Sequence, residues 1–100
     1  MSYESKMKSE ELNELFRAVL TLQDGEACYR FFEDLCTIQE LQAMGQRLTV
    51  ARLLKLGVTY QEVAAQTGAS TTTISRVNRC LHYGADGYNR VLDQLEDEGY

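Results

Sequence analysis

The chain has 100 residues, of which 44% are hydrophobic and 25% are charged, with seven Gly and no Pro. This is ordinary usage for one globular domain, so we expect a single domain over 1–100 and exclude a disordered chain. No apolar run approaches the roughly 18–20 residues that cross a bilayer, and the N-terminus lacks the apolar stretch of a signal peptide. We therefore expect a cytoplasmic protein without membrane contact. The absence of Pro favours helix along the whole chain.

The net charge of −5 is unevenly distributed. Residues 44–83 carry five bases and one acid, whereas residues 1–43 and 84–100 are both acidic. Charges separated by more than a Debye length of about 8 Å are largely screened, so a partner responds to the local field. The middle segment would attract an anionic partner, although five bases over forty residues are also compatible with an ordinary solvated surface.

Three cysteines and one histidine give no metal-binding spacing. Cys28, Cys36 and Cys80 form no C-x-x-C pair, and the single histidine is His82. We expect reduced, mostly buried thiols and neither a metal nor a cofactor. One intermolecular disulfide or a redox-sensing thiol is the alternative.

Three helices are predicted in the first half of the chain. Ser9 and Asp24 are N-cap candidates for the first two. Thr37 and Glu40 have the spacing of a capping box at the start of the third, and Gly57 marks its end. The apolar stripes of the first two helices are Leu12, Leu15, Phe16, Val19, Leu20 and Leu22, followed by Cys28, Phe31, Phe32 and Leu35.

The second half predicts two short helices and a final helix. Thr59 opens a second capping box, Gly68 ends that helix, and Ser70 caps the next, which Gly84 ends. The final helix occupies 86–98. The expected fold is therefore all-α, with about six helices.

Residues 58–83 have the pattern of a helix-turn-helix. Ala64 is a small residue midway along the first helix, which allows close crossing, and Gly68 accepts the positive φ of a tight turn. Ile74 and Val77 are placed to pack the second helix on the first.

The outer face of this motif predicts DNA binding. Hydroxyls can donate or accept at base edges and phosphates, and arginine suits phosphate and guanine. Four consecutive Ser/Thr residues form helix poorly, so they are costly on a face without a function. The alternative is an αα-hairpin with a solvated Ser/Thr surface. The expected DNA contacts are Gln61, Ser70, Thr71, Thr72, Thr73, Ser75 and Arg79.

Two longer segments resemble the Trp repressor family. One is Thr37-Ile38-Gln39-Glu40-Leu41-Gln42-Ala43-Met44-Gly45-Gln46-Arg47, and the other is Gly68-Ala69-Ser70-Thr71-Thr72-Thr73-Ile74-Ser75-Arg76. The resemblance covers about Phe31 to Leu95. The segments Ser75-Arg76-Val77 and Tyr83-Gly84-Ala85-Asp86-Gly87-Tyr88 are similar to the Trp-repressor-like branch called YerC/YecD.

The resemblance implies an intertwined homodimer. In this family the N-terminal helices of two subunits interlock, which implies that residues 1–36 are dimerisation helices. The second helix of the helix-turn-helix would then enter the major groove of double-stranded DNA twice per dimer.

The resemblance also indicates where an effector would bind. The Trp repressor holds tryptophan between two arginines with help from a threonine and a serine, and the matching positions are Thr37, Arg47, Arg76 and Cys80. Val77 replaces the glycine that leaves space for the indole, and Cys80 replaces the serine. Both changes oppose tryptophan binding. The two arginines then grip phosphates, pair with acids, or hold another amino-acid-like or anionic effector.

Three functional classes compete. The leading hypothesis is a dimeric DNA-binding regulator, more specifically a repressor, and the second is a helical module that binds protein through its acidic ends. An enzyme is the weakest, because no Ser-His-Asp or Cys-His arrangement and no phosphate-binding glycine loop is present. We expect Tyr83 and Tyr88 to be packing residues and not stacking platforms for nucleic acid.

Overall fold

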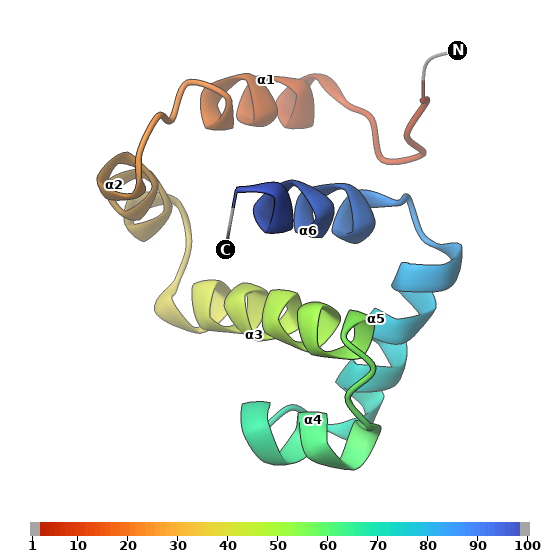
Figure 1. Cartoon of the computed structure of the whole chain (residues 1–100). Helices are drawn as coiled ribbons and strands as arrows, with labels where there is room; N and C mark the ends of the chain where they lie inside the picture. Colours follow the sequence, from red (N-terminus) through yellow and green to blue (C-terminus); the bar gives the residue numbers. More distant parts are fainter. Residues whose placement is uncertain (1–2, 99–100) are drawn as a thin grey trace. The chain divides into compact units, whose positions relative to one another are not determined.

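The computed structural model describes residues 3–98, which form helices and no strand. The helices are α1 (Glu10–Val19), α2 (Gly25–Leu35), α3 (Ile38–Lys55), α4 (Tyr60–Thr67), α5 (Thr71–Tyr83) and α6 (Gly87–Asp97) (Figure 1). The prediction of an all-α chain of about six helices is confirmed. The chain forms two compact units, divided between Ile38 and Gln39. Within the described residues, no helix has the length and apolar character needed to cross a membrane.

The first unit contains α1 and α2, which begin at the predicted caps. Ser9 Oγ accepts a hydrogen bond from the Leu12 amide at 3.1 Å, and Asp24 Oδ1 accepts from the Ala27 amide at 2.8 Å. The first helix ends at Val19, before the apolar stripe does, in a turn where Leu20 donates back to the Phe16 carbonyl. Neither helix contains a buried residue.

The second unit begins with α3, which ends in a Schellman motif. Gly57 has a φ of 86°, its amide donates to the Leu54 carbonyl at 3.0 Å, and the Val58 amide donates to the Leu53 carbonyl at 3.1 Å. Val58 and Leu53 also share the hydrophobic core, which completes the motif. Gly57 is therefore the predicted helix stop, and it reverses the chain toward α4.

A single core holds α3 to α6 together in this unit. Val50, Val63 and Ile74 are fully buried, which brings side chains of α3, α4 and α5 into contact. The buried residues of this core are Val50, Ala51, Leu53, Val63, Ala69, Ile74, Val77 and Leu92.

Two expectations about side-chain burial are wrong. Cys28 and Cys80 are exposed and Cys36 is half-buried, because α2 buries no residue and Cys80 opens onto a surface pocket. Tyr88 packs against the core as expected, but Tyr83, in the last turn of α5, is 85% exposed.

Candidate nucleic-acid interface

The helix-turn-helix consists of α4, the turn at Gly68 and α5 (Figure 1). Gly68 has a φ of 74°, the left-handed conformation that glycine adopts without strain. Thr59 Oγ1 accepts from the Glu62 amide at 3.2 Å, so α4 starts where the capping box predicts. The two helices pack directly against each other. The local geometry expected of the motif is therefore present.

The two faces of α5 differ sharply. Ile74 and Val77 are buried, which fixes the inner face against the core. The side chains of Thr71, Thr72 and Ser75 are exposed and make no hydrogen bond to any residue between 3 and 98. An exposed row of uncommitted hydroxyls is therefore available to an external partner.

Ser70 and Thr73 have a structural role of their own. Ser70 Oγ accepts from the Thr73 amide at 3.1 Å and donates to Thr73 Oγ1 at 3.2 Å. Thr73 is half-buried. Ser70 therefore caps α5, and Thr73 supplies the amide and the hydroxyl that Ser70 bonds. Another predicted DNA contact, Gln61 on α4, is exposed and has no side-chain bond inside the described chain.

Most cations of residues 44–83 have no acidic partner. Lys55 Nζ lies 3.1 Å from Asp93 Oδ1, but the others form no ion pair with residues of the described range 3–98. Guanidinium groups are charged at every physiological pH, so these side chains carry an uncompensated positive field. The unpaired arginines are Arg47, Arg52, Arg76 and Arg79.

The four expected effector residues occupy different settings. Cys80 lines an apolar pocket of about 450 Å³ together with Leu48 and Tyr88. Arg47 is half-buried and Arg76 is exposed, and neither lines that pocket. Thr37 immediately precedes α3 and is exposed.

Val77 is 2% exposed and belongs to the hydrophobic core. The branched side chain therefore occupies packed space, where glycine would leave a cavity.

The structural role of one residue in this region was not predicted from the sequence. Gln46, in the middle of α3, donates from Nε2 to the carbonyl oxygen of Thr67 at 3.1 Å in a partly buried setting. The two residues are 21 positions apart, and a glutamine amid a helix carries no local sign of such a bond.

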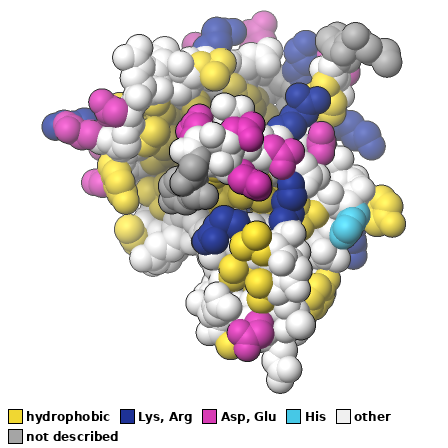
Figure 2. Space-filling model, in the orientation of Figure 1, with side chains coloured by type: hydrophobic (Ala, Val, Ile, Leu, Met, Phe, Trp, Pro, Cys, Tyr) yellow, Lys and Arg dark blue, Asp and Glu magenta, His cyan; other side chains and the backbone are white. Residues whose placement is uncertain are grey.

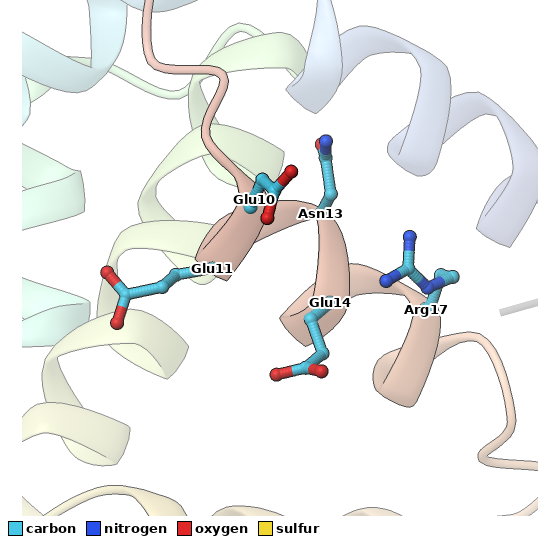
Figure 3. A pocket seen from close by; sticks show the side chains of 5 residues that line it. All are labelled: Glu10, Glu11, Asn13, Glu14 and Arg17. Atoms are coloured by element: carbon cyan, nitrogen blue, oxygen red, sulfur yellow. The ribbon is translucent and has the colours of Figure 1, made fainter.

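A second hollow lies on α1 and has a different character. It has a volume of about 350 Å³ and is lined by Glu10, Glu11, Asn13, Glu14 and Arg17. Their side chains fan out from the helix and do not converge on one point (Figure 3). No cluster of three or more His, Cys, Asp or Glu suited to a metal occurs among the described residues. This acidic face is therefore a solvated helix surface.

Large hydrophobic side chains remain exposed on both units. Phe16 on α1 and Leu20, the residue that follows α1, are 57% and 83% exposed, and Tyr29 on α2 is 71% exposed. The face in Figure 2 shows hydrophobic side chains open to the surface among acidic and basic ones. Where such side chains form a contiguous patch, the patch marks a site of association with another molecule.

Several known proteins are similar to this chain in sequence, and two solved structures also share its fold. The family model of the Trp repressor protein matches residues 10–96. The uncharacterized protein YerC of Bacillus subtilis (strain 168) is 54% identical over 92 residues, which are 92% of this chain and 88% of YerC. The crystal structure of a TrpR-like protein from Eubacterium eligens ATCC 27750 matches with a TM-score of 0.87 and 50% identity, covering 91% of this chain and 94% of that one. A solved structure from Staphylococcus aureus also gives a TM-score of 0.87, at 49% identity and 91% coverage of both chains.

Proposed function

The chain belongs to the Trp repressor family, and we propose that it is a cytoplasmic transcriptional regulator that binds double-stranded DNA. In this proposal it acts as a homodimer, represses its target genes and does not respond to tryptophan. α5 is the recognition helix and lies in the major groove. Helix-turn-helix dimers, the Trp repressor among them, bind half-sites about 34–36 Å apart.

The observation that carries this proposal is the outer face of α5. Thr71, Thr72 and Ser75 are exposed without internal partners, and Arg76 and Arg79 add positive charge on the same helix. Hydroxyls read base edges and phosphates, while arginine contacts phosphate or guanine. The net charge of the chain is negative, but the acids lie mostly outside residues 44–83, so the local field at α5 favours a polyanion.

The test is selection of bound duplexes from fragmented DNA of the host genome, followed by gel-shift titration. We expect recovery of a discrete sequence with a Kd of roughly 10⁻⁸–10⁻¹¹ M and a steep loss of affinity with salt. Recovery of no preferred sequence, or a complex that is indifferent to salt, would contradict the proposal. In that case retention of a protein partner by the acidic ends would favour the interaction module.

Dimerisation is supported by the helices of the first unit. α1 and α2 contain no buried side chain within one chain, yet Phe16, Tyr29 and the α1 C-cap residue Leu20 are highly exposed. Fully burying one such side chain stabilises an assembly by about 1.5–3 kcal/mol. A second copy of the chain would supply the missing contacts for residues 1–36.

The absence of a tryptophan response rests on two positions. Val77 takes up space inside the core, and Cys80 offers a thiol at a site where a hydroxyl would hold the ligand's polar group. A site that loses a hydrogen-bonding partner loses much of its affinity. Titration calorimetry with L-tryptophan is expected to give no micromolar binding. Binding that also strengthens the DNA complex would overturn this part of the proposal.

A further inference from the structure

We propose that Gln46 is a positioning residue that fixes the direction of the recognition helix. Its Nε2 donates to the Thr67 carbonyl oxygen at 3.1 Å, which joins the middle of α3 to the last residue of α4. The inference rests on the proposed DNA-binding function, because it concerns the orientation in which α5 is presented to DNA.

The acceptor of this bond lies at the turn of the helix-turn-helix. The last four carbonyls of a helix have no partner within the helix, and Thr67 is the final residue of α4. Gln46 satisfies its carbonyl from α3. The bond therefore attaches the end of α4 to a different and longer helix.

The Thr67 side chain extends the connection toward α5. Its Oγ1 donates to the Val63 carbonyl at 2.7 Å and accepts from the Ala69 amide at 3.1 Å. Ala69 is 6% exposed, and the next residue, Ser70, caps α5. A continuous set of hydrogen bonds and backbone thus runs from Gln46 to the first turn of the recognition helix.

Directionality explains why this polar connection matters. The core contacts between α3 and the motif are made by apolar side chains such as Val50, Val63 and Ile74. Apolar packing is largely non-directional, whereas a hydrogen bond weakens steeply away from its preferred angle. A binding constellation needs its side chains held within about 0.5 Å, and sequence is read by the base contacts, whereas phosphate contacts carry no sequence information. Loss of Gln46 should therefore weaken sequence selectivity more than general DNA affinity.

The test compares the Gln46→Met variant with the wild-type chain. Methionine keeps the length and neutrality of the side chain but removes the donor. The probes are the duplex that the wild-type chain selects and a random-sequence duplex of the same length. We expect affinity for the selected duplex to fall roughly tenfold, with little change for the random duplex and an unchanged salt slope.

Two further variants separate positioning from stability. Gln42→Met lies one turn earlier on α3 at an exposed residue. It should keep the selectivity ratio, which is the affinity for the selected duplex divided by that for the random duplex. Leu95→Ala removes a half-buried side chain that packs on the core, so it should lower the Tm and still keep the ratio. Hydrogen exchange at the Ala69 amide should accelerate in Gln46→Met but not in Gln42→Met.

The results of these variants decide whether Gln46 has a positioning role. If the Gln46→Met variant keeps the ratio within twofold, or if Leu95→Ala loses it equally, Gln46 has no positioning role, while DNA binding itself stands. If Gln46→Met does not fold, Thr67→Val replaces it, because that change removes the hydroxyl bonds at the other end of the connection. A wild-type chain that selects no duplex overturns the proposed function and this inference together.

Discussion

Asn89 Nδ2 on α6 donates a hydrogen bond to the carbonyl oxygen of Leu81 on α5, at 3.0 Å. The same amide group lies 3.1 Å from Asp86 Oδ1. Asp86 precedes α6 with a φ of 69°, a left-handed conformation that Asp adopts more readily than most residues. Asn89 therefore links the last turn of α5 to the start of α6.

Replacement of Asn89 by Ala should destabilise the protein by about 1–2 kcal/mol. The change removes the donor to the partly buried Leu81 carbonyl and leaves Asp86 to hold its backbone conformation without that support. Chemical denaturation monitored by circular dichroism measures the effect. Gln94→Ala on the exposed face of α6 is the control and should alter stability by less than about 0.5 kcal/mol. Equal effects of the two substitutions would show that the link is not stabilising.

Gly84 is required because of a close approach and not because of its φ. A Cβ at this position would lie 2.5 Å from the Cys80 carbonyl oxygen, which the Gly84 amide already binds at 3.0 Å. We expect Gly84→Ala to cost about 1–3 kcal/mol, measured as a fall in the denaturation midpoint. Gly87, the first residue of α6, has no atom within 4 Å of an added Cβ. If Gly87→Ala were as destabilising as Gly84→Ala, the steric explanation would be wrong.

Local chemistry predicted where the helices begin and how two of the turns are made. The caps at Ser9, Asp24, Thr59 and Ser70 are set by side chains that bond an amide three residues ahead, so a short sequence window contains the whole signal. Gly57 and Gly68 have the predicted positive φ for the same reason.

The features that could not be predicted from the sequence depend on contacts between residues far apart in the chain. The Gln46–Thr67 bond spans 21 positions, and nothing near either residue marks it. Tyr83, which we expected to be a packing residue, is 85% exposed in the last turn of α5. Asp86 stands at the N-cap of α6 without a capping side-chain bond. Its carboxylate instead binds Asn89 and lies 3.4 Å from Arg90 Nε. Short sequence patterns therefore predict the helices, whereas the packing of the helices decides which distant residues bond to each other.

A charged substitution on the exposed apolar face of α1 should weaken the proposed dimer. Phe16 is 57% exposed in one chain, and Phe16→Glu would place a carboxylate where we expect the second copy. We expect the dimer dissociation constant to rise about 100-fold, since central interface aromatics often contribute 2 kcal/mol or more. Sedimentation equilibrium provides the measurement, with Glu11→Gln on the polar face of α1 as the control. A wild-type chain that sediments as a monomer at high concentration would refute the dimer.

Removal of the α5 arginines should abolish DNA binding through the loss of phosphate contacts. Arg76 and Arg79 form no ion pair within the described part of the chain, so their charge is available to DNA. The double variant Arg76→Glu/Arg79→Glu should not bind the selected duplex. Arg90→Glu, on α6, loses only a surface pair with Asp86 at 3.4 Å and should keep its affinity. Persistent binding by the double variant would exclude α5 as the DNA-binding surface.

Thr72 and Arg79 should contribute to DNA binding in different ways. Thr72 is exposed in the first turn of α5, where the recognition helices of this motif contact base edges. Thr72→Val keeps the shape of the side chain but removes its hydroxyl. Preference at one base pair of each half-site should therefore weaken by about 1–3 kcal/mol without a change in salt slope.

Arg79→Ala should have the opposite signature. Loss of one phosphate contact per protomer would reduce the magnitude of the salt slope by about two for a dimer and leave base preference intact. Repeated selection with each variant measures preference, and titration at several salt concentrations measures the slope. If Thr72→Val changes the slope, or if Arg79→Ala changes the selected sequence, the assignment of base and phosphate contacts along α5 must be reversed. If neither variant alters either quantity, the hydroxyl-rich face of α5 does not contact DNA.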